Sequence, residues 1–119
     1  MGAATLAGCG GGGGGGGDPA VTVPAGKVVE VKASEFKFVP TKIVVDAGSG
    51  PVKITLHNDG ATAHNLRVEK GGDDVGGTPI FVPGQSQTAS LALKPGRYEF
   101  LCSVGDHAAL GMKGTLEVR

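Results

Sequence analysis

The stretch "YEFLCSVGDHAALGMKGTLEV", residues 98–118, decides the fold. Its first residues alternate, which places Tyr98, Phe100 and Cys102 on one face of a strand. A loop with several glycines follows, and alternation resumes at residues 113–118, where Leu116 and Val118 face inward. The stretch therefore predicts a strand, a loop and a second strand.

The same alternation runs through the chain from residue 27 onward, and no apolar stripe has the spacing of a helix. Alternation turns Phe36, Phe38, Ile43 and Val45 inward. We expect strands at 27–33, at 36–45 with a break at Pro40, and at 51–60, 64–70 and 113–119. Residues 87–102 should form two strands joined by a turn at 94–96. A loop is expected at 71–77. Seven to eight short strands with frequent turn signals predict an all-β protein with a Greek-key β-sandwich.

The N-terminal end has a different composition, because residues 10–17 are all glycine. Such a run loses much backbone entropy on ordering and has no side chains to bury, so we expect a flexible tether. We divide the chain into residues 1–26, a lipobox-like start and tether, and residues 27–119, one folded domain.

The sequence "LAGC" at residues 6–9 resembles the lipobox at which bacterial lipoprotein signal peptides are cut and the cysteine is acylated. The resemblance implies lipidation of Cys9 and a membrane-anchored domain in the periplasm or at the cell surface. Only five residues precede Leu6, which is too few for a complete signal peptide. The alternative is a free thiol in a disordered tail.

The charges are balanced, with eleven basic and eleven acidic residues and a formal net charge of zero. No segment concentrates basic residues with interleaved aromatic ones. Nucleic acid is therefore not an expected partner. No apolar run approaches the length of about 20 residues that a membrane-spanning helix requires.

Soft donor side chains gather near the end of the chain, where Cys102, His107 and Met112 are spaced five residues apart. A fourth donor, His64, stands at the start of a predicted strand. Two imidazoles and a thiolate with a weak methionine contact form the ligand set of blue-copper electron-transfer sites. The thiolate and the thioether suit Cu(I), and imidazole accepts both oxidation states, so the set predicts a site for one copper ion.

The domain at residues 27–119 resembles the cupredoxins, the small blue-copper family of plastocyanin, azurin and auracyanin. The motifs that carry the resemblance are "FKFVP" (36–40), "NDGATAHN" (58–65) and the stretch at 98–118. It implies one copper ion with His64, Cys102 and His107 as equatorial ligands and Met112 as the axial ligand. It also implies that Asn65 braces the ligand loop and hydrogen-bonds near the cysteine sulfur.

The expected function is one-electron transfer between redox protein partners, which would dock near His107 and Leu110. With only His57 left over, and expected on the surface, the chain lacks ligands for a second copper centre, so we expect no enzymatic activity.

Several alternatives stay open at this point. The chain could be a copper carrier or buffer that delivers metal to a copper enzyme, or a metal-free interaction module. A zinc site or a Cys-His nucleophile could also use the same cysteine and histidines, although thioether is a poor zinc ligand and no oxyanion hole is evident.

Overall fold

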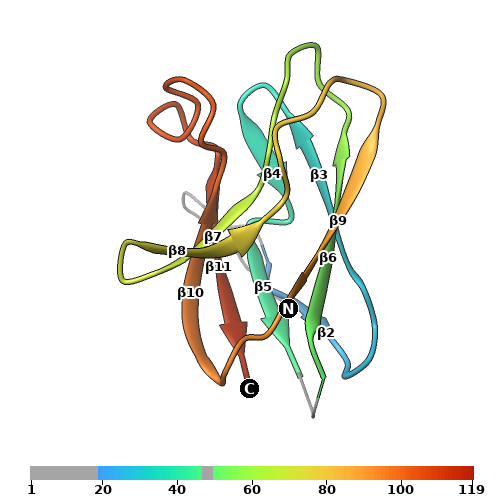
Figure 1. The fold of residues 1–119 in the computed structure, drawn as a ribbon, viewed down its shortest axis with the longest axis vertical. Coiled ribbons are helices and arrows are strands. Elements are labelled where there is room, and N and C mark those ends of the chain that lie inside the picture. The colour runs from blue at the N-terminus through green and yellow to red at the C-terminus, as the bar shows by residue number, and fades with distance from the viewer. Residues whose placement is uncertain (1–18, 47–49) are drawn as a thin grey trace, which may run out of the picture.

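The computed structural model describes residues 19–46 and 50–119. Cys9 and the glycine run lie outside these residues. None of the described residues forms a helix long and apolar enough to cross a bilayer. They form ten strands (Figure 1), which are β2 (Val21–Val23), β3 (Val29–Ser34), β4 (Lys37–Val39), β5 (Lys42–Val45), β6 (Val52–Asn58), β7 (Arg67–Lys70), β8 (Asp73–Gly77), β9 (Ser86–Leu91), β10 (Gly96–Leu101) and β11 (Lys113–Val118).

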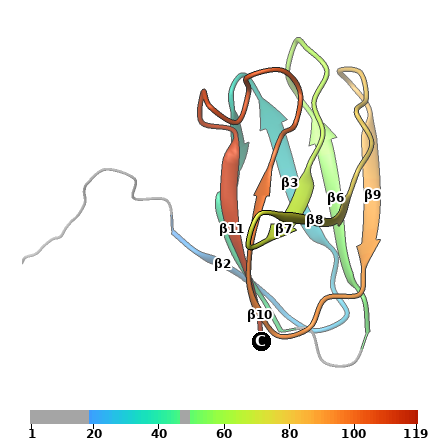
Figure 2. The same cartoon turned by 60° about the vertical axis from the view of Figure 1, so that its left-hand side comes forward.

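The strands form two sheets that pack face to face (Figure 2). The larger sheet has the order β2-β5-β11-β10-β7-β8, and the smaller one has the order β4-β3-β6-β9. Strands β10 and β11 are antiparallel neighbours, with Tyr98 opposite Leu116 and Leu101 opposite Lys113. The predicted all-β Greek-key sandwich is confirmed, with more strands in the described residues than the seven to eight expected.

The core lies between the sheets and is built from the inward positions of the alternating strands. Val31, Leu56 and Val68 are completely buried there. The rings of Phe38 and Phe100 meet edge to face with their centroids 5.3 Å apart. Each fully buried side chain of this size stabilises the fold by about 1.5–3 kcal/mol. The two sheets are thereby held as a rigid frame beneath the loops at one end.

The structure departs from the prediction at the N-terminal boundary of the domain. Residues 21–23, which we assigned to the tether, form β2 and pair in parallel with β5. Two β-branched valines and a threonine favour a strand, and Val23 is buried at the edge of the sheet. The hydrogen-bonded fold therefore begins before residue 27.

Two further strands differ from their predicted positions. The loop predicted at 71–77 contains β8, which pairs with β7 through a bulge between Val68 and Glu69. The strand predicted at 64–70 begins only at Arg67, because His64 leaves the sheet and forms an isolated bridge with Phe81. His64 is thus placed in a loop instead of within a regular strand.

Phe36 was expected in the core, and this prediction was wrong. Phe38, Ile43 and Val45 are buried as expected, whereas Phe36 is 36% exposed. The reason is a turn at residues 35–36, between β3 and β4, which interrupts the two-residue alternation. The ring of Phe36 lies instead at the end of the sandwich that carries the candidate site.

Candidate metal centre

Two loops at one end of the sandwich carry the predicted donors. Cys102 follows the last residue of β10, and His107 and Met112 lie in the loop that leads to β11. His64 precedes β7, and its backbone exchanges two hydrogen bonds with Phe81. The β-sandwich thereby brings His64 beside donors that are separated from it by 38 residues or more in the chain.

The two imidazoles and the thiol converge. The Sγ atom of Cys102 lies 3.4 Å from Nδ1 of His107 and 3.9 Å from Nδ1 of His64. One donor atom from each of the three residues lies within 4.8 Å of the others. Cys102 and His64 are completely buried, and His107 is half-buried. Both histidines turn Nδ1 toward the sulfur, so the donors surround a common point.

The donor set fits a copper ion. Two donors 3.4–3.9 Å apart can both lie about 2.0–2.3 Å from one ion, which is the usual range of metal–nitrogen and metal–thiolate bonds. A thiolate with two imidazoles is also the ligand chemistry of blue copper. His64, Cys102 and His107 are therefore positioned to bind one copper ion, as the sequence predicted.

Met112 lies beside this group and is tied to it through the backbone. The N–H of Cys102 donates to the carbonyl of Met112 over 3.1 Å, and the N–H of Met112 donates to the carbonyl of His107, also over 3.1 Å. The Met112 side chain is completely buried. These bonds close the loop between β10 and β11 on itself and fix its three donor-bearing residues relative to one another.

Asn65 connects the two halves of the site. Its Nδ2 donates to Oγ of Ser103, and the N–H of Ser103 donates to its Oδ1, each over 2.8 Å. Asn65 follows His64 and Ser103 follows Cys102 in the sequence, so the pair links the neighbours of two donors. The family resemblance predicts that Asn65 braces the ligand loop, and that role stays a prediction.

Glu35 was not among the predicted site residues, yet its Oε2 lies 2.8 Å from Nε2 of His64. Hydrogen bonds from the N–H of Ala61, the imidazole of His64 and Thr62 hold the pKa of Glu35 down at about 2. The carboxyl group is therefore ionised at neutral pH. No residue pattern pointed to Glu35, because it lies 29 residues before His64 in an unremarkable turn.

Phe36, the next residue, contacts the other histidine. Its ring centroid lies 4.7 Å from that of His107, with the planes tilted by 49°. The sequence carried no signal for this contact, because Phe36, Lys37 and Phe38 alternate regularly and the interruption at residues 35–36 is seen only in the structure. Residues 35 and 36 thus touch both imidazoles of the site from one turn.

His57 is outside the donor group, as expected. It lies on the outer face of the smaller sheet, where Nδ1 is 2.7 Å from Oγ of Ser86 and Nε2 is 2.5 Å from Oε1 of Glu30. Within the described part of the chain, the only group of three or more close His, Cys, Asp or Glu side chains is the one formed by His64, Cys102 and His107.

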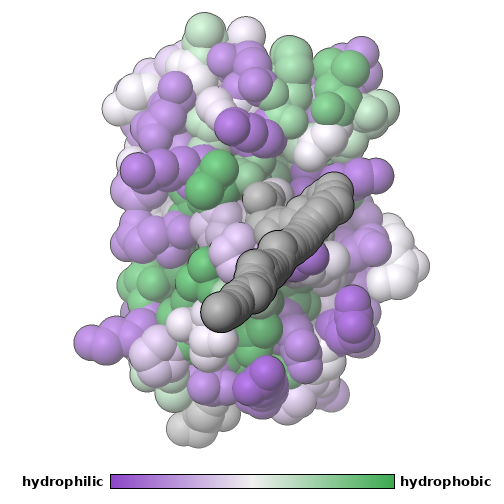
Figure 3. Space-filling model, turned by 180° about the vertical axis from the view of Figure 1, so that it is seen from behind, coloured by the Kyte–Doolittle hydropathy of each residue, from purple (hydrophilic) through white to green (hydrophobic). Residues whose placement is uncertain are grey.

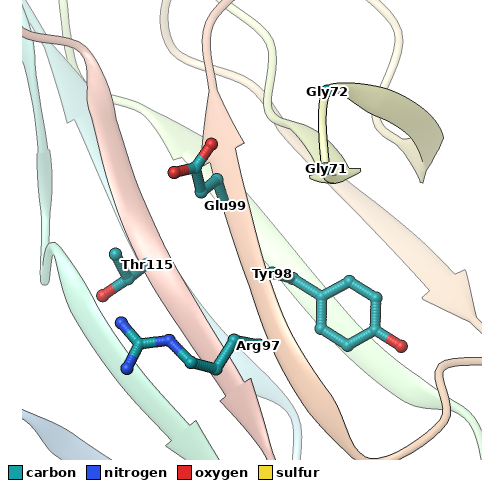
Figure 4. A pocket seen from close by; sticks show the side chains of 6 residues that line it. All are labelled: Gly71, Gly72, Arg97, Tyr98, Glu99 and Thr115. Atoms are coloured by element: carbon teal, nitrogen blue, oxygen red, sulfur yellow. The ribbon is translucent and has the colours of Figure 1, made fainter.

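A shallow hollow lies beside β10 and the turn between β7 and β8, and Figure 4 shows its lining residues. Arg97 and Glu99 have opposite charges and point away from Tyr98, whose ring is buried. The remaining lining residues are Gly71, Gly72 and Thr115. This hollow contains none of the copper donors.

Comparison with known proteins agrees with the geometry. A family model described as "Cupredoxin-like domain" matches residues 19–118. The chain belongs to this cupredoxin family. No curated protein matches the chain by sequence.

Solved structures of cupredoxins share the fold. A reduced auracyanin from Roseiflexus castenholzii is 26% identical, with a TM-score of 0.72 over 80% of this chain and 98% of the auracyanin chain. Rusticyanin from Thiobacillus ferrooxidans is 21% identical, with a TM-score of 0.61 over 90% of this chain and 86% of its own. A copper-containing nitrite reductase from Thermus scotoductus matches at 20% identity and a TM-score of 0.61, but over only 28% of its length.

Proposed function

We propose that this protein transfers single electrons between redox partners through one copper ion bound by His64, Cys102 and His107. The observation that carries the proposal is the convergence of the Cys102 sulfur with Nδ1 of both histidines. Copper, when bound, supplies the Cu(II)/Cu(I) couple. The auracyanin likeness supports the same conclusion, since that structure is described as a chemically reduced form.

The protein's own residues would hold the ion in one geometry through both oxidation states. The β10–β11 loop is closed by backbone hydrogen bonds, and Asn65 ties it to the segment that carries His64. Complete burial of Cys102 and His64 keeps water from these two donors. A site that does not rearrange when its charge changes needs little reorganisation, and this favours fast electron transfer.

Met112 would provide the weak axial contact. Its thioether is completely buried, and its backbone is bonded to those of Cys102 and His107. Thioether is a soft ligand that suits the reduced ion. We expect Met112→Gln to keep copper but to lower its reduction potential, because an amide oxygen favours Cu(II) more than sulfur does.

Redox partners would dock on the apolar rim around His107. His107 is half-buried, and its neighbours Leu110 and Phe36 are 53% and 36% exposed. On the rear face, apolar residues reach the surface at the upper end of the molecule (Figure 3). An apolar patch next to an exposed ligand edge suits brief contact with a partner protein. Leu110→Asp should slow electron exchange with such a partner without changing the copper spectrum.

The domain would work outside the cytoplasm, in the periplasm or at the cell surface. The lipobox-like "LAGC" before the glycine run supports an acylated Cys9 that anchors the domain through a tether. Mass spectrometry of the protein from its native membrane would test this, since acylation adds a defined mass to the N-terminal peptide.

The deciding experiment is addition of Cu(II) to the purified domain. We expect an intense visible thiolate-to-copper absorption band and a reversible one-electron wave, both lost in Cys102→Ser. His57→Ala is the matched control, because His57 lies outside the donor group, and it should leave both signals unchanged. A colourless Cu(I) site that exchanges metal readily would favour the copper-carrier alternative. Failure to bind copper would favour a metal-free module.

A further inference from the structure

We propose that Glu35 is a positioning residue for the copper ligand His64, which it holds with Nδ1 free for the metal, and that its negative charge favours Cu(II) over Cu(I). Only the second part of the inference, the preference for Cu(II) over Cu(I), rests on the proposed function. The first part concerns the apo-protein.

The contact itself is short and partly shielded. Nε2 of His64 lies 2.8 Å from Oε2 of Glu35, and the side chains are 0% and 30% exposed. The Glu35 carboxylate oxygens accept hydrogen bonds from neighbouring N–H and O–H groups, and the same acceptor role toward Nε2 of His64 places the proton of a neutral imidazole on Nε2. In that tautomer Nδ1, which faces the Cys102 sulfur, keeps a free lone pair. The carboxylate therefore selects the tautomer that a metal ion requires.

The carboxylate is itself fixed in place. It accepts hydrogen bonds from the N–H of Ala61 at 2.9 Å, from the N–H of Thr62 at 3.2 Å and from Oγ1 of Thr62 at 3.0 Å. These donors belong to the segment that leads directly to His64. Glu35 thus joins the turn between β3 and β4 to the loop that carries the ligand, and it reaches the imidazole in a defined orientation.

Gly60 makes room for this arrangement. A Cβ atom at position 60 would lie 2.8 Å from Nε2 of His64 and would overlap the Glu35 carboxylate. A side chain at position 60 would therefore have to displace the carboxylate from the imidazole. The Gly60 backbone thus packs directly against the Glu35–His64 pair.

The charge has a predictable effect on the couple. Cu(II) carries one more positive charge than Cu(I), and a carboxylate bonded to a ligand imidazole stabilises the more highly charged ion more strongly. Glu35 should therefore lower the reduction potential of the site. Replacement by glutamine removes the charge but keeps an oxygen that can accept the Nε2 proton, so it separates charge from position.

The chain supplies a matched control. Glu30 forms the same kind of pair with His57, with Oε1 of Glu30 lying 2.5 Å from Nε2 of His57 on the outer face of the smaller sheet. Like Glu35→Gln, Glu30→Gln removes the carboxylate from a glutamate–histidine pair. Unlike Glu35, however, Glu30 does not contact a predicted copper ligand. Any difference between the two variants reports on the site and not on net charge.

The test begins with ¹⁵N NMR of the histidine rings in the apo-protein. We expect the His64 signal of the unsubstituted chain and of Glu35→Gln to show a proton on Nε2, and Glu35→Ala to lose this preference. Cu(II) and Cu(I) affinities are then measured by chelator competition, and potentials by voltammetry. Glu35→Gln should weaken Cu(II) binding about 10- to 100-fold, weaken Cu(I) binding less and raise the potential. Glu30→Gln should match the unsubstituted protein.

Two results would overturn the proposal. One is a proton on Nδ1 of His64 in the apo-protein, and the other is a potential in Glu35→Gln equal to that in Glu30→Gln. A protein that binds copper without a blue absorption band would contradict the proposed function instead. The tautomer measurement would still decide the role of Glu35 in that case, because it needs no metal.

Discussion

Asn65 and Ser103 bind each other through two hydrogen bonds of 2.8 Å, although they are 38 residues apart in the chain. Each of them follows a copper donor directly in the sequence. The amide uses both its oxygen and its nitrogen in this contact, and Asn65 is 3% exposed. The pair therefore joins the two donor segments directly.

Asn65→Ala should destabilise the apo-protein by about 1–3 kcal/mol, because it removes both bonds and leaves the Ser103 N–H without its acceptor. Urea unfolding measures this loss. Ser103→Ala removes only the bond to the hydroxyl group and should cost about 0.5–1.5 kcal/mol. Equal stability of Asn65→Ala and the unsubstituted protein would show that the pair does not hold the loops together.

Gly60→Ala should disturb the metal centre more than the fold. The added Cβ would meet the Glu35 carboxylate, which is the movable end of a side chain, and would come within 2.8 Å of Nε2 of His64. We expect weaker copper binding and a changed reduction potential, with a small change in unfolding temperature. Gly50→Ala is the control, since a Cβ at that position meets no atom within 4 Å. Identical copper affinity in the two variants would contradict the expectation.

Phe36→Ala should speed the loss of copper to an external chelator several-fold. The Phe36 ring contacts the half-buried His107, with the ring centroids 4.7 Å apart and the planes tilted by 49°. Its removal opens a path for water and chelator to the ligand. Because Phe36 is 36% exposed, the free energy of unfolding should change by less than about 1 kcal/mol. Leu110→Ala, on the same rim, should release copper at the original rate.

Asp74→Asn should remove a pH-dependent contribution to stability. Nε and Nη2 of Arg67 donate to the Asp74 carboxylate over 2.9 and 2.8 Å, and this guanidinium lowers the pKa of Asp74 from 3.8. A lowered pKa means that the stabilisation is complete above pH 3.8 and is lost as pH falls through the lower value. The pair is partly exposed, so we expect about 0.2–1 kcal/mol.

The measurement is urea unfolding of the apo-protein and of Asp74→Asn between pH 7 and pH 2. The difference between the two proteins should be constant at neutral pH and shrink toward zero in acid. Asp73→Asn, on the same strand, serves as the control. A difference that grows as pH falls would show that the sign is wrong.

The sequence was sufficient to predict the fold class and the three converging donors. Strong two-residue alternation at 52–56 and 98–102 reports directly on which side chains are buried. Cys102 and His107 share one short loop, so their proximity follows from chain length alone. The position of His64 followed from the family resemblance and from its place before a strand, and the structure brings it within 3.9 Å of the Cys102 sulfur.

The sequence was not sufficient to predict contacts that depend on how separate turns meet. Glu35 looks like any exposed glutamate, and its role becomes visible only when the 34–37 turn is placed against residues 60–64. Phe36 was predicted to face inward, but the turn at residues 35–36 interrupts the alternation and leaves its side chain outside the core. The segments at 21–23 and 73–77 are short and flanked by glycines and prolines, so their local sequence pattern did not predict strands. They form strands because each pairs with a neighbouring strand.

The parallel pairing of β2 with β5 also has a mechanical consequence. Val21 to Val23 lie opposite Ile43 to Val45. Tension along the chain at Ala20 therefore acts on these three residue pairs together, in shear, and does not separate them one after another. The loop between β10 and β11 lies at the upper end of the sandwich, whereas β2 lies in its lower half (Figure 1). A pull on the chain at Ala20 therefore acts first on the β2–β5 edge of the larger sheet, which contains none of the metal ligands.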